Sequence, residues 1–453
     1  MNAWDPVPDL EVAAALGKKL RAAGYTEDAI TARLGEDGPA ADSEDVPVLA
    51  RRLGNRDFDE LLRLLLLNLP VERRRIDGAD ELVTLGFAVR DGEQLVPRGR
   101  IIPTEGLYLA FDTFSVGLAD PPGWVASFTP TSYWLACVTP RPRVRRALDV
   151  GTGNGAHALF AARHADHVIA TDVNQRALDF TAIGAALNGF TNVETRQGSF
   201  FEPVEGETFG LITCNAPYVV SPERRWQYRD AGGRGDEVSE LVVRESAAHL
   251  EDGGYAAVSL SWLAASRHEP DSHFEDWIDG SSCDAWLIGL HASDPLDHAA
   301  AWTDHLQDDA AEEALERWTS YIEELGATWV SEGVAVLRKR EGSRFGLSAE
   351  AVEEDELEHA GDQAVRILNG LALLSENRLA GRRFKLVDDA MFRQELDNEG
   401  DSTELVLALD GGTHPEIEIE PDELDLLTRP FDAASVGDEL LRDLLEGGFV
   451  EPA

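Results

Sequence analysis

Residues 148–155 read Leu-Asp-Val-Gly-Thr-Gly-Asn-Gly, and this stretch decides the fold expected around it. It follows a short apolar run and precedes a helical pattern. Closely spaced glycines let a backbone approach a ligand, and the start of the next helix offers unpaired N–H groups. Gly151 to Ala156 also fits the looser dinucleotide fingerprint Gly-x-Gly-x-x-(Gly/Ala). The loop alone therefore predicts a nucleotide-type ligand and leaves a dinucleotide open.

Strand and helix patterns alternate at short spacing on the C-terminal side of this loop. Expected strands cover 147–150, 167–173, 193–198, 209–215, 254–262, 284–291 and 333–338, and expected helices cover 157–165, 175–189, 236–250 and 309–325. Such alternation indicates βαβ units and a parallel sheet. We therefore expect an α/β domain over residues 119–342.

The spacing of the glycines separates the loop from a plain dinucleotide motif. Asp149 lies two residues before the first glycine, and Gly155 is a third alternating glycine. Asp-x-Gly-x-Gly-x-Gly resembles the first motif of class I S-adenosylmethionine (SAM) methyltransferases. The resemblance implies a Rossmann-like, mostly parallel seven-stranded sheet, with Asp149 helping to hold the amino-acid end of SAM. The implied cofactor-binding residues of this motif are Asp149, Gly151, Thr152, Gly153, Asn154 and Gly155.

Two further strand ends are expected to complete the cofactor site. Asp172, with Val173 after it, ends the second strand, and a carboxylate there suits the two hydroxyl donors of a ribose. That role would serve NAD as well as SAM. The third strand of the family ends near the adenine, where an acidic residue is common. This chain has Ser199 instead, whose hydroxyl can still accept, and Phe200 can flank the ring.

The fourth motif argues against a dehydrogenase and indicates which kind of atom receives the methyl group. The strand at 209–214 is followed by Asn215, Ala216, Pro217 and Tyr218. This resembles the (Asn/Asp)-Pro-Pro-(Tyr/Phe) signature of methyltransferases that act on planar amino nitrogens. The Asn215 side-chain oxygen and the next carbonyl can accept both N–H hydrogens and orient a weakly nucleophilic nitrogen. Ala216 replaces the usual first proline, so the carbonyl acceptor remains but the rigidity of the turn is reduced.

The resemblance extends to the glutamine-N5 methyltransferase (HemK-like) group. Its members have a Gly-Gly-x-Asp-Gly stretch after the signature, and residues 232–236 here read Gly-Gly-Arg-Gly-Asp, with the last two exchanged. Thr131 and Tyr133 lie where such enzymes have a segment near the cofactor. The resemblance covers about 125–340, and the flanking regions have no counterpart in the short members of the group.

The flanking regions are expected to form two accessory domains, residues 1–118 and an acidic domain at 343–453. The first pattern is helices followed by a small hairpin, which a winged-helix-like module and a generic α+β domain explain equally well. The last helix, Gly447-Gly448 and strand indicate a second small winged module. Residues 345–361 are acidic and polar and are expected to be a linker or a surface helix. We find no internal repeat by inspection.

The charge of the chain limits which kinds of macromolecule it can bind. The formal net charge is −44, spread as −5 over 1–145, −20 over 146–339 and −19 over 340–453. Such a field repels polyanions and anionic membranes. The first third is the least acidic, and the arginines that it contains include those at 51, 52, 56, 63, 73, 74, 75, 90, 98 and 100. This third would be the face that binds RNA or DNA if the substrate were a nucleic acid.

The prediction is a SAM-dependent N-methyltransferase acting on a macromolecule. Its target would be a glutamine amide of a release-factor-like protein, or a base amine of RNA or DNA. A non-catalytic, SAM-binding winged-helix regulator is the alternative. Three dispersed cysteines form no CxxC pair, which fits a reducing cytoplasm and gives no zinc site. We expect no metal, no membrane partner and a cytoplasmic location, and the sequence leaves the oligomeric state open.

Overall fold

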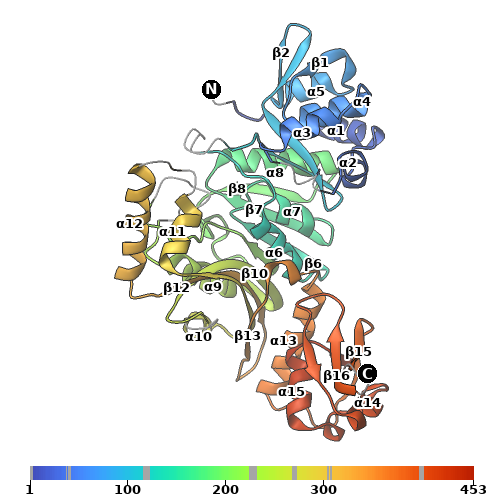
Figure 1. The fold of residues 1–453 in the computed structure, drawn as a ribbon, viewed down its shortest axis with the longest axis vertical. Helices are drawn as coiled ribbons and strands as arrows, with labels where there is room; N and C mark the ends of the chain where they lie inside the picture. Colours follow the sequence, from blue (N-terminus) through green and yellow to red (C-terminus); the bar gives the residue numbers. More distant parts are fainter. Residues whose placement is uncertain are drawn as a thin grey trace. The chain divides into compact units, whose positions relative to one another are not determined.

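The computed structural model describes residues 4–36, 38, 42–115, 123–223, 232–267, 273–303, 306, 309–396 and 402–453. The chain forms two compact units, and Figure 1 labels their helices and strands. The first comprises mainly Met1–Ser132 and Val144–Glu205, and the second comprises Tyr133–Arg143, Gly206–Arg224 and Asp230–Ala453. Helix α6 (Pro130–Val138) carries the chain from one to the other. The predicted boundary at 118–119 lies outside the described residues, so the three-domain division stays a prediction.

The first unit begins with an accessory region of short helices and hairpins. Its helices are α1 (Leu10–Ala22), α2 (Glu27–Leu34), α3 (Val46–Arg52), α4 (Asp57–Leu61) and α5 (Ala79–Thr84), and its strands are β1 (Val71–Glu72), β2 (Ala88–Asp91), β3 (Gln94–Pro97), β4 (Gly99–Thr104) and β5 (Leu107–Asp112). Asp9 starts α1 by accepting a hydrogen bond from the Val12 amide. One turn of π-helix, Leu62–Leu66, follows α4, and four of its leucines are buried. The apolar spacing of these helices therefore builds a core of its own.

Three parallel strands complete the first unit, in the order β6-β7-β8. They are β6 (Val144–Val150), β7 (Ala165–Asp172) and β8 (Val193–Gln197), linked by α7 (Ala156–Ala161) and α8 (Gln175–Asn188). Helix α1 packs on α8 so closely that a Cβ on Gly17 would lie 2.0 Å from the Leu187 carbonyl oxygen. Arg21 also donates to that carbonyl, at 2.9 Å. The accessory region is thus fixed on the helix that follows Asp172.

The second unit holds a mixed sheet in the order β13-β11-β12-β10-β9. Its strands are β9 (Phe209–Cys214), β10 (Leu250–Ala264), β11 (Cys283–Ser293), β12 (Trp329–Lys339) and β13 (Leu347–Ala351), and its helices include α9 (Glu237–His249), α10 (Phe274–Ile278), α11 (Pro295–Thr303) and α12 (Asp309–Glu324). Strand β10 pairs parallel with β9 and antiparallel with β12. Every residue of β9 is buried, as expected for a strand covered on both faces. The α/β class is confirmed.

Strand β13 differs from the prediction for residues 345–361. We expected a linker or surface helix there, but Leu347–Ala351 pairs parallel with β11 from Ala285 to Gly289. Four of its five residues are half-buried, and the Trp286 ring nitrogen donates to Glu350 at 2.7 Å. The acidic composition hid this strand because Glu350 takes a buried hydrogen-bond partner instead of facing solvent.

The rest of the second unit is a small α+β region. Its elements are α13 (Gly361–Ser375), β14 (Arg383–Leu386), β15 (Ala390–Leu396), β16 (Ser402–Leu409), β17 (Glu416–Glu418), α14 (Pro421–Leu427), β18 (Phe431–Asp432), α15 (Asp438–Glu446) and β19 (Val450–Pro452). A core built on Phe384, Phe431 and Phe449 joins α15 to the strands. Helix α15 buries four leucines and exposes four of its five charged residues.

The two accessory regions share one structural motif, which inspection of the sequence missed. Residues 70–87 and 430–449 each run from proline through a two-residue strand, a 3₁₀ turn and a helix to Gly-Phe. Each forms a three-stranded sheet with an antiparallel central strand, β1-β3-β2 and β18-β14-β19. The central strand follows the motif in the first region and precedes it in the second. This circular permutation, with the low residue identity, hid the repeat.

Candidate active site

The glycine loop joins β6 to α7 in a conformation that side chains disfavour. Gly151, Gly153 and Gly155 have φ values of 66°, 55° and 83°, in the left-handed region that glycine adopts at little cost. A Cβ on Gly155 would also lie 2.8 Å from the Thr181 hydroxyl oxygen. The alternating glycines therefore set the shape of the loop and bring it close to α8.

Asp149 stabilises the glycine loop through hydrogen bonds from within the protein. It is 1% exposed, and its Oδ2 accepts hydrogen bonds from the Thr152 hydroxyl at 2.6 Å and the Ala158 amide at 3.0 Å. Asn154 caps the next turn, since its side-chain oxygen accepts from the Ala156 amide at 3.0 Å. At least one Asp149 oxygen is thus used inside the loop, and its contact with the amino-acid end of SAM stays a prediction.

Asp172 connects the end of β7 to the glycine loop. Its Oδ2 accepts from the Gly153 amide at 3.0 Å, and its Oδ1 accepts from the Asn174 amide at 2.8 Å. Burial raises the pKa of the Asp172 carboxyl above the usual aspartate value, and backbone hydrogen bonds from Asn174, Gly153 and Val173 partly oppose the rise. The glycine loop and the end of β7, which are the first two predicted parts of the cofactor site, are therefore in direct contact through Asp172.

The third predicted element adds an apolar surface. Val173 is 47% exposed directly after Asp172. Ser199 and Phe200 are half-buried, and the Phe200 carbonyl accepts from the Thr171 hydroxyl at 3.2 Å. Phe200 has a φ of 46°, rare for an aromatic residue, and such strain is concentrated at functional sites. A carboxylate beside exposed apolar surface is the combination that a nucleoside needs.

The Asn-Ala-Pro-Tyr turn begins where the buried strand β9 ends. Asn215, Pro217 and Tyr218 are half-buried, and Ala216 is 4% exposed. The Ser261 hydroxyl on β10 donates to the Tyr218 carbonyl. Two residues further on, His298 Nε2 on α11 lies 3.0 Å from the Val220 carbonyl oxygen, to which it donates. The main chain after the turn is thus fixed at two points that the sequence motif did not reveal.

His298 is itself held in a buried setting. It is 2% exposed, with its Nδ1 3.9 Å from Oε1 of Glu332, which is 7% exposed. Burial raises the pKa of Glu332, while the charge of His291 and a hydrogen bond from Trp302 lower it. No local pattern around His298 marks this role, because its partners lie far away in sequence.

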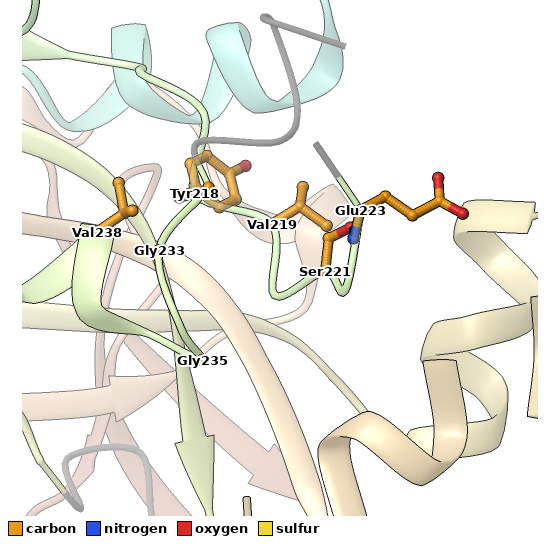
Figure 2. A pocket seen from close by; sticks show the side chains of 8 residues that line it. Tyr218, Val219, Ser221, Glu223, Gly233, Gly235 and Val238 are labelled. Atoms are coloured by element: carbon orange, nitrogen blue, oxygen red, sulfur yellow. The ribbon is translucent and has the colours of Figure 1, made fainter. Parts of the chain in front are cut away.

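A pocket opens beside Tyr218 within the second unit. Figure 2 shows the Tyr218 and Val238 side chains toward one side and Ser221 and Glu223 toward the other. Backbone of the Gly-Gly-Arg-Gly stretch lines the pocket as well. A Cβ on Gly233 would lie 2.7 Å from the Val238 side chain, and the Gly235 amide donates to the Tyr321 hydroxyl at 2.8 Å. The exchanged Gly235 has a φ of 60°, a conformation that side chains disfavour.

Glu223 gives this pocket a charged edge. Its carboxylate forms an ion pair with Arg317 and accepts from the Trp318 ring nitrogen at 3.3 Å. The Ser221 hydroxyl accepts from the Glu223 amide at 3.0 Å. The pocket thus combines an aromatic ring, exposed backbone and a carboxylate that α12 holds in place.

The predicted roles of Thr131 and Tyr133 near the cofactor stay predictions. Thr131 is half-buried, with its hydroxyl 3.0 Å from that of Thr129, and Tyr133 is 37% exposed. Residues 224–231, within the HemK-like resemblance, lie outside the described residues. Among the residues that are described, no group of three or more His, Cys, Asp or Glu is placed to hold a metal ion. In the same part of the chain, no helix is both long and apolar enough to cross a membrane.

Comparisons with known proteins identify two regions. Residues 144–278 match a family described as a methyltransferase domain, and residues 22–98 match a domain of unknown function, DUF7059. A release factor glutamine methyltransferase of Xylella fastidiosa is 34% identical over 130 residues, which are 26% of this chain and 47% of the relative. A ribosomal protein uL3 glutamine methyltransferase of Bradyrhizobium diazoefficiens is 28% identical over 169 residues, 33% of this chain and 52% of the relative.

The chain thus spans about half the length of the curated relatives that it matches. Among solved structures, a methyltransferase from Pyrococcus furiosus aligns over 51% of this chain and 90% of its own, with a TM-score of 0.30 and 18% identity. The matched residues 144–278 include the glycine loop, Asp172 and the turn from Asn215 to Tyr218. This chain therefore contains a methyltransferase domain, similar to those of the HemK-like glutamine methyltransferases.

Proposed function

We propose that this chain is a SAM-dependent N-methyltransferase whose target is a glutamine amide of a protein. The observation that carries the proposal is the Asn-Ala-Pro-Tyr turn, which follows β9 within the matched methyltransferase domain and is fixed by Ser261 and His298. The two relatives described above are named for glutamine methylation of a release factor and of a ribosomal protein. A planar amide is the common chemistry of both targets.

The residues of the first unit fit SAM. Asp172 offers carboxylate oxygens to the ribose hydroxyls, and Val173 offers apolar surface to the adenine. The glycine loop leaves the main chain open to the amino-acid end, because Gly151 and Gly153 carry no Cβ. SAM supplies the methyl group, bound to a positively charged sulfur.

The Asn-Ala-Pro-Tyr turn supplies the chemistry at the target nitrogen. The lone pair of an amide nitrogen is delocalised, so the nitrogen is a poor nucleophile until its geometry is fixed. The Asn215 side-chain oxygen and the Ala216 carbonyl accept the two N–H hydrogens, and Tyr218 stacks on the amide plane. As the nitrogen–carbon bond forms, the carbon–sulfur bond breaks and its electron pair stays on sulfur. The proton then leaves to water, so no general base is required.

The charge of the accessory regions favours a protein target over a nucleic acid. The exposed residues of α15 are Asp438, Glu439, Arg442 and Asp443, so its outer face is acidic. Helix α5, in the equivalent place of the first motif, exposes Asp80. The acidic outer face of α15 would repel phosphates if the helix were used as a winged-helix reader, whereas Asp80 on α5 is ion-paired with Arg73 and Arg90.

The arginines of the first third are also largely committed to partners within the chain. Ion pairs to carboxylates are formed by Arg63, Arg73, Arg74, Arg75 and Arg90. Arg100 is 5% exposed and donates to the Leu66 carbonyl. These pairings weaken the reading of this third as a polyanion-binding face.

The test uses radiolabelled SAM, the purified full chain, and extract from cells that lack its gene. We expect labelled material that protease digestion removes and nuclease digestion leaves, and acid hydrolysis should release the label as methylamine from the amide. Label that nuclease removes would instead make the target a base amine. SAM binding without any label would favour a non-catalytic regulator, and Asn215→Ala serves as the catalytic blank.

A further inference from the structure

A segment of main chain, residues 123–126, is tied to both cofactor loops. The Asn174 side-chain amide donates to the Gly123 carbonyl at 3.0 Å. The Asn154 side-chain amide donates to the Ala126 carbonyl at 3.1 Å. Asn154 belongs to the glycine loop and Asn174 follows Asp172 by two residues, so this strap (residues 123–126) connects the two proposed SAM-binding elements.

The strap is anchored at its centre by a buried ion pair. Asp112, at the end of β5, accepts at Oδ2 from the Val125 amide at 2.9 Å and from Arg176 Nε at 2.9 Å. A second Arg176 nitrogen pairs with the other Asp112 oxygen. The Arg176 and Asp112 side chains are 10% and 6% exposed. Removing one partner of such a pair leaves an uncompensated buried charge, so Arg176 determines where Asp112 and the strap can sit.

Arg176 also extends this network to the start of the chain. Its guanidinium carbon lies 4.6 Å from the centroid of the Trp4 ring, and its Nη1 donates to the Trp4 carbonyl. The Trp4 ring packs edge-on against Phe87 and Phe180, with centroids 5.6 and 5.9 Å apart. A Cβ on Gly99 would lie 2.8 Å from that ring. The DUF7059-matching region therefore contacts Trp4 through Phe87, and the Trp4 ring in turn contacts Arg176.

We propose that Arg176 is a positioning residue for SAM binding, acting through Asp112 and the strap on Asn154 and Asn174. Through Trp4 it also makes SAM affinity depend on the accessory region. Arg176 touches none of the reacting atoms in this scheme. The proposal rests on the proposed function, since it requires that the glycine loop and Asp172 bind SAM.

The test compares SAM binding and turnover in full-length variants. We expect Arg176→Ala to raise the Kd and KM for SAM by about tenfold, with kcat at saturating SAM nearly unchanged, because one charged hydrogen-bonding unit is lost. Arg176→Lys keeps the charge but not the fork geometry or the stacking, so it should recover part of the affinity. Trp4→Ala should give a smaller increase in Kd.

Arg21→Ala is the matched control. Arg21 also joins the accessory region to α8, but it bonds Leu187 at the other end of that helix. We expect its SAM Kd to equal that of the unmodified chain. Absence of SAM binding by the unmodified chain would overturn the proposed function itself. An unchanged Kd in folded Arg176→Ala would overturn only the positioning role, and if that variant does not fold, an unchanged Kd in Trp4→Ala does the same.

Discussion

The Ser261 hydroxyl donates its hydrogen bond to the main-chain carbonyl of Tyr218. The family signature has its first proline at the position where this chain has Ala216. A proline restricts its own φ and the conformation of the residue before it. In this chain, a side chain from the neighbouring strand β10 fixes the carbonyl two residues later. Sequence reasoning predicted a looser turn, and the structure shows a different source of rigidity.

Ser261→Ala should therefore lower turnover more than stability. Loss of one hydrogen bond costs about 1 kcal/mol, and loosening the turn should reduce kcat about tenfold. The SAM Kd should not change, because the variant leaves the first unit intact. Steady-state kinetics with titration calorimetry separates the two effects.

Ser259→Ala is the matched control on the same strand. Ser259 is 2% exposed, and among the described residues its hydroxyl has no hydrogen-bond partner. It lies two residues earlier, on the same face of β10. We expect unchanged kcat and equal or higher stability. Equal loss of kcat in both variants would mean that β10 packing, not the bond to Tyr218, supports the turn.

Asn215→Ala should abolish most of the methyl transfer and leave SAM binding intact. Its side-chain oxygen is the acceptor that orients the target nitrogen, and removal of one preorganised polar group at a reacting centre costs about 10²-fold or more in kcat. Single-turnover transfer of label to the protein substrate measures the loss. Full activity of this variant would remove Asn215 from the mechanism.

Gly155→Ala should distort the glycine loop and weaken SAM binding. An added Cβ would lie 2.8 Å from the Thr181 hydroxyl oxygen. The φ of 83° at this position also disfavours any side chain. Gly189→Ala has a similar φ of 79° but nothing within 4 Å of its Cβ, so it isolates the backbone cost of about 1–2 kcal/mol. Thermal unfolding should show both variants destabilised, and only Gly155→Ala should lose SAM affinity. Equal SAM binding in the two would show that the contact with α8 is unimportant.

The central part of the fold could be predicted because its signals are local. The helices expected at 175–189 and 309–325 are observed as Gln175–Asn188 and Asp309–Glu324. The loop from Gly151 to Gly155 was identified by spacing, and its positive φ values are what that spacing requires. Such features depend on neighbours within a few residues, so period and turn chemistry identify them.

The missed features depend on partners distant in sequence. Strand β13 pairs with β11 at the edge of the sheet, and the acidic segment 345–361 that contains it gave no strand signal. Ser261 and His298 reach the turn at Tyr218 and Val220 from 43 and 78 residues away. Arg176 joins Trp4 across 172 residues. Tertiary contacts of this kind leave no periodic trace, so only the structure reveals them.

The pH dependence of SAM binding should follow Asp172. Burial raises the pKa of this carboxyl. In the free protein, a raised pKa means that Asp172 stabilises the fold below the usual aspartate pKa, and this contribution is lost as the pH rises through the raised value. The pH dependence of SAM affinity has the opposite sign to that of stability, because the ribose hydroxyls donate to the ionised carboxylate. Affinity should therefore fall as the pH drops through the raised pKa, and binding near that pH should release a proton.

Titration calorimetry over a pH series that starts at neutral pH and ends at the usual aspartate pKa, in two buffers of different ionisation enthalpy, measures both effects. Asp172→Asn should bind SAM about tenfold more weakly, since a charge-assisted acceptor becomes a neutral one, and its affinity should lose the pH dependence. Asp443→Asn is the control, because burial also raises the pKa of Asp443 on α15 and no proposed SAM contact involves it. A pH profile that persists unchanged in Asp172→Asn would place the titrating group elsewhere and remove Asp172 as the ribose acceptor.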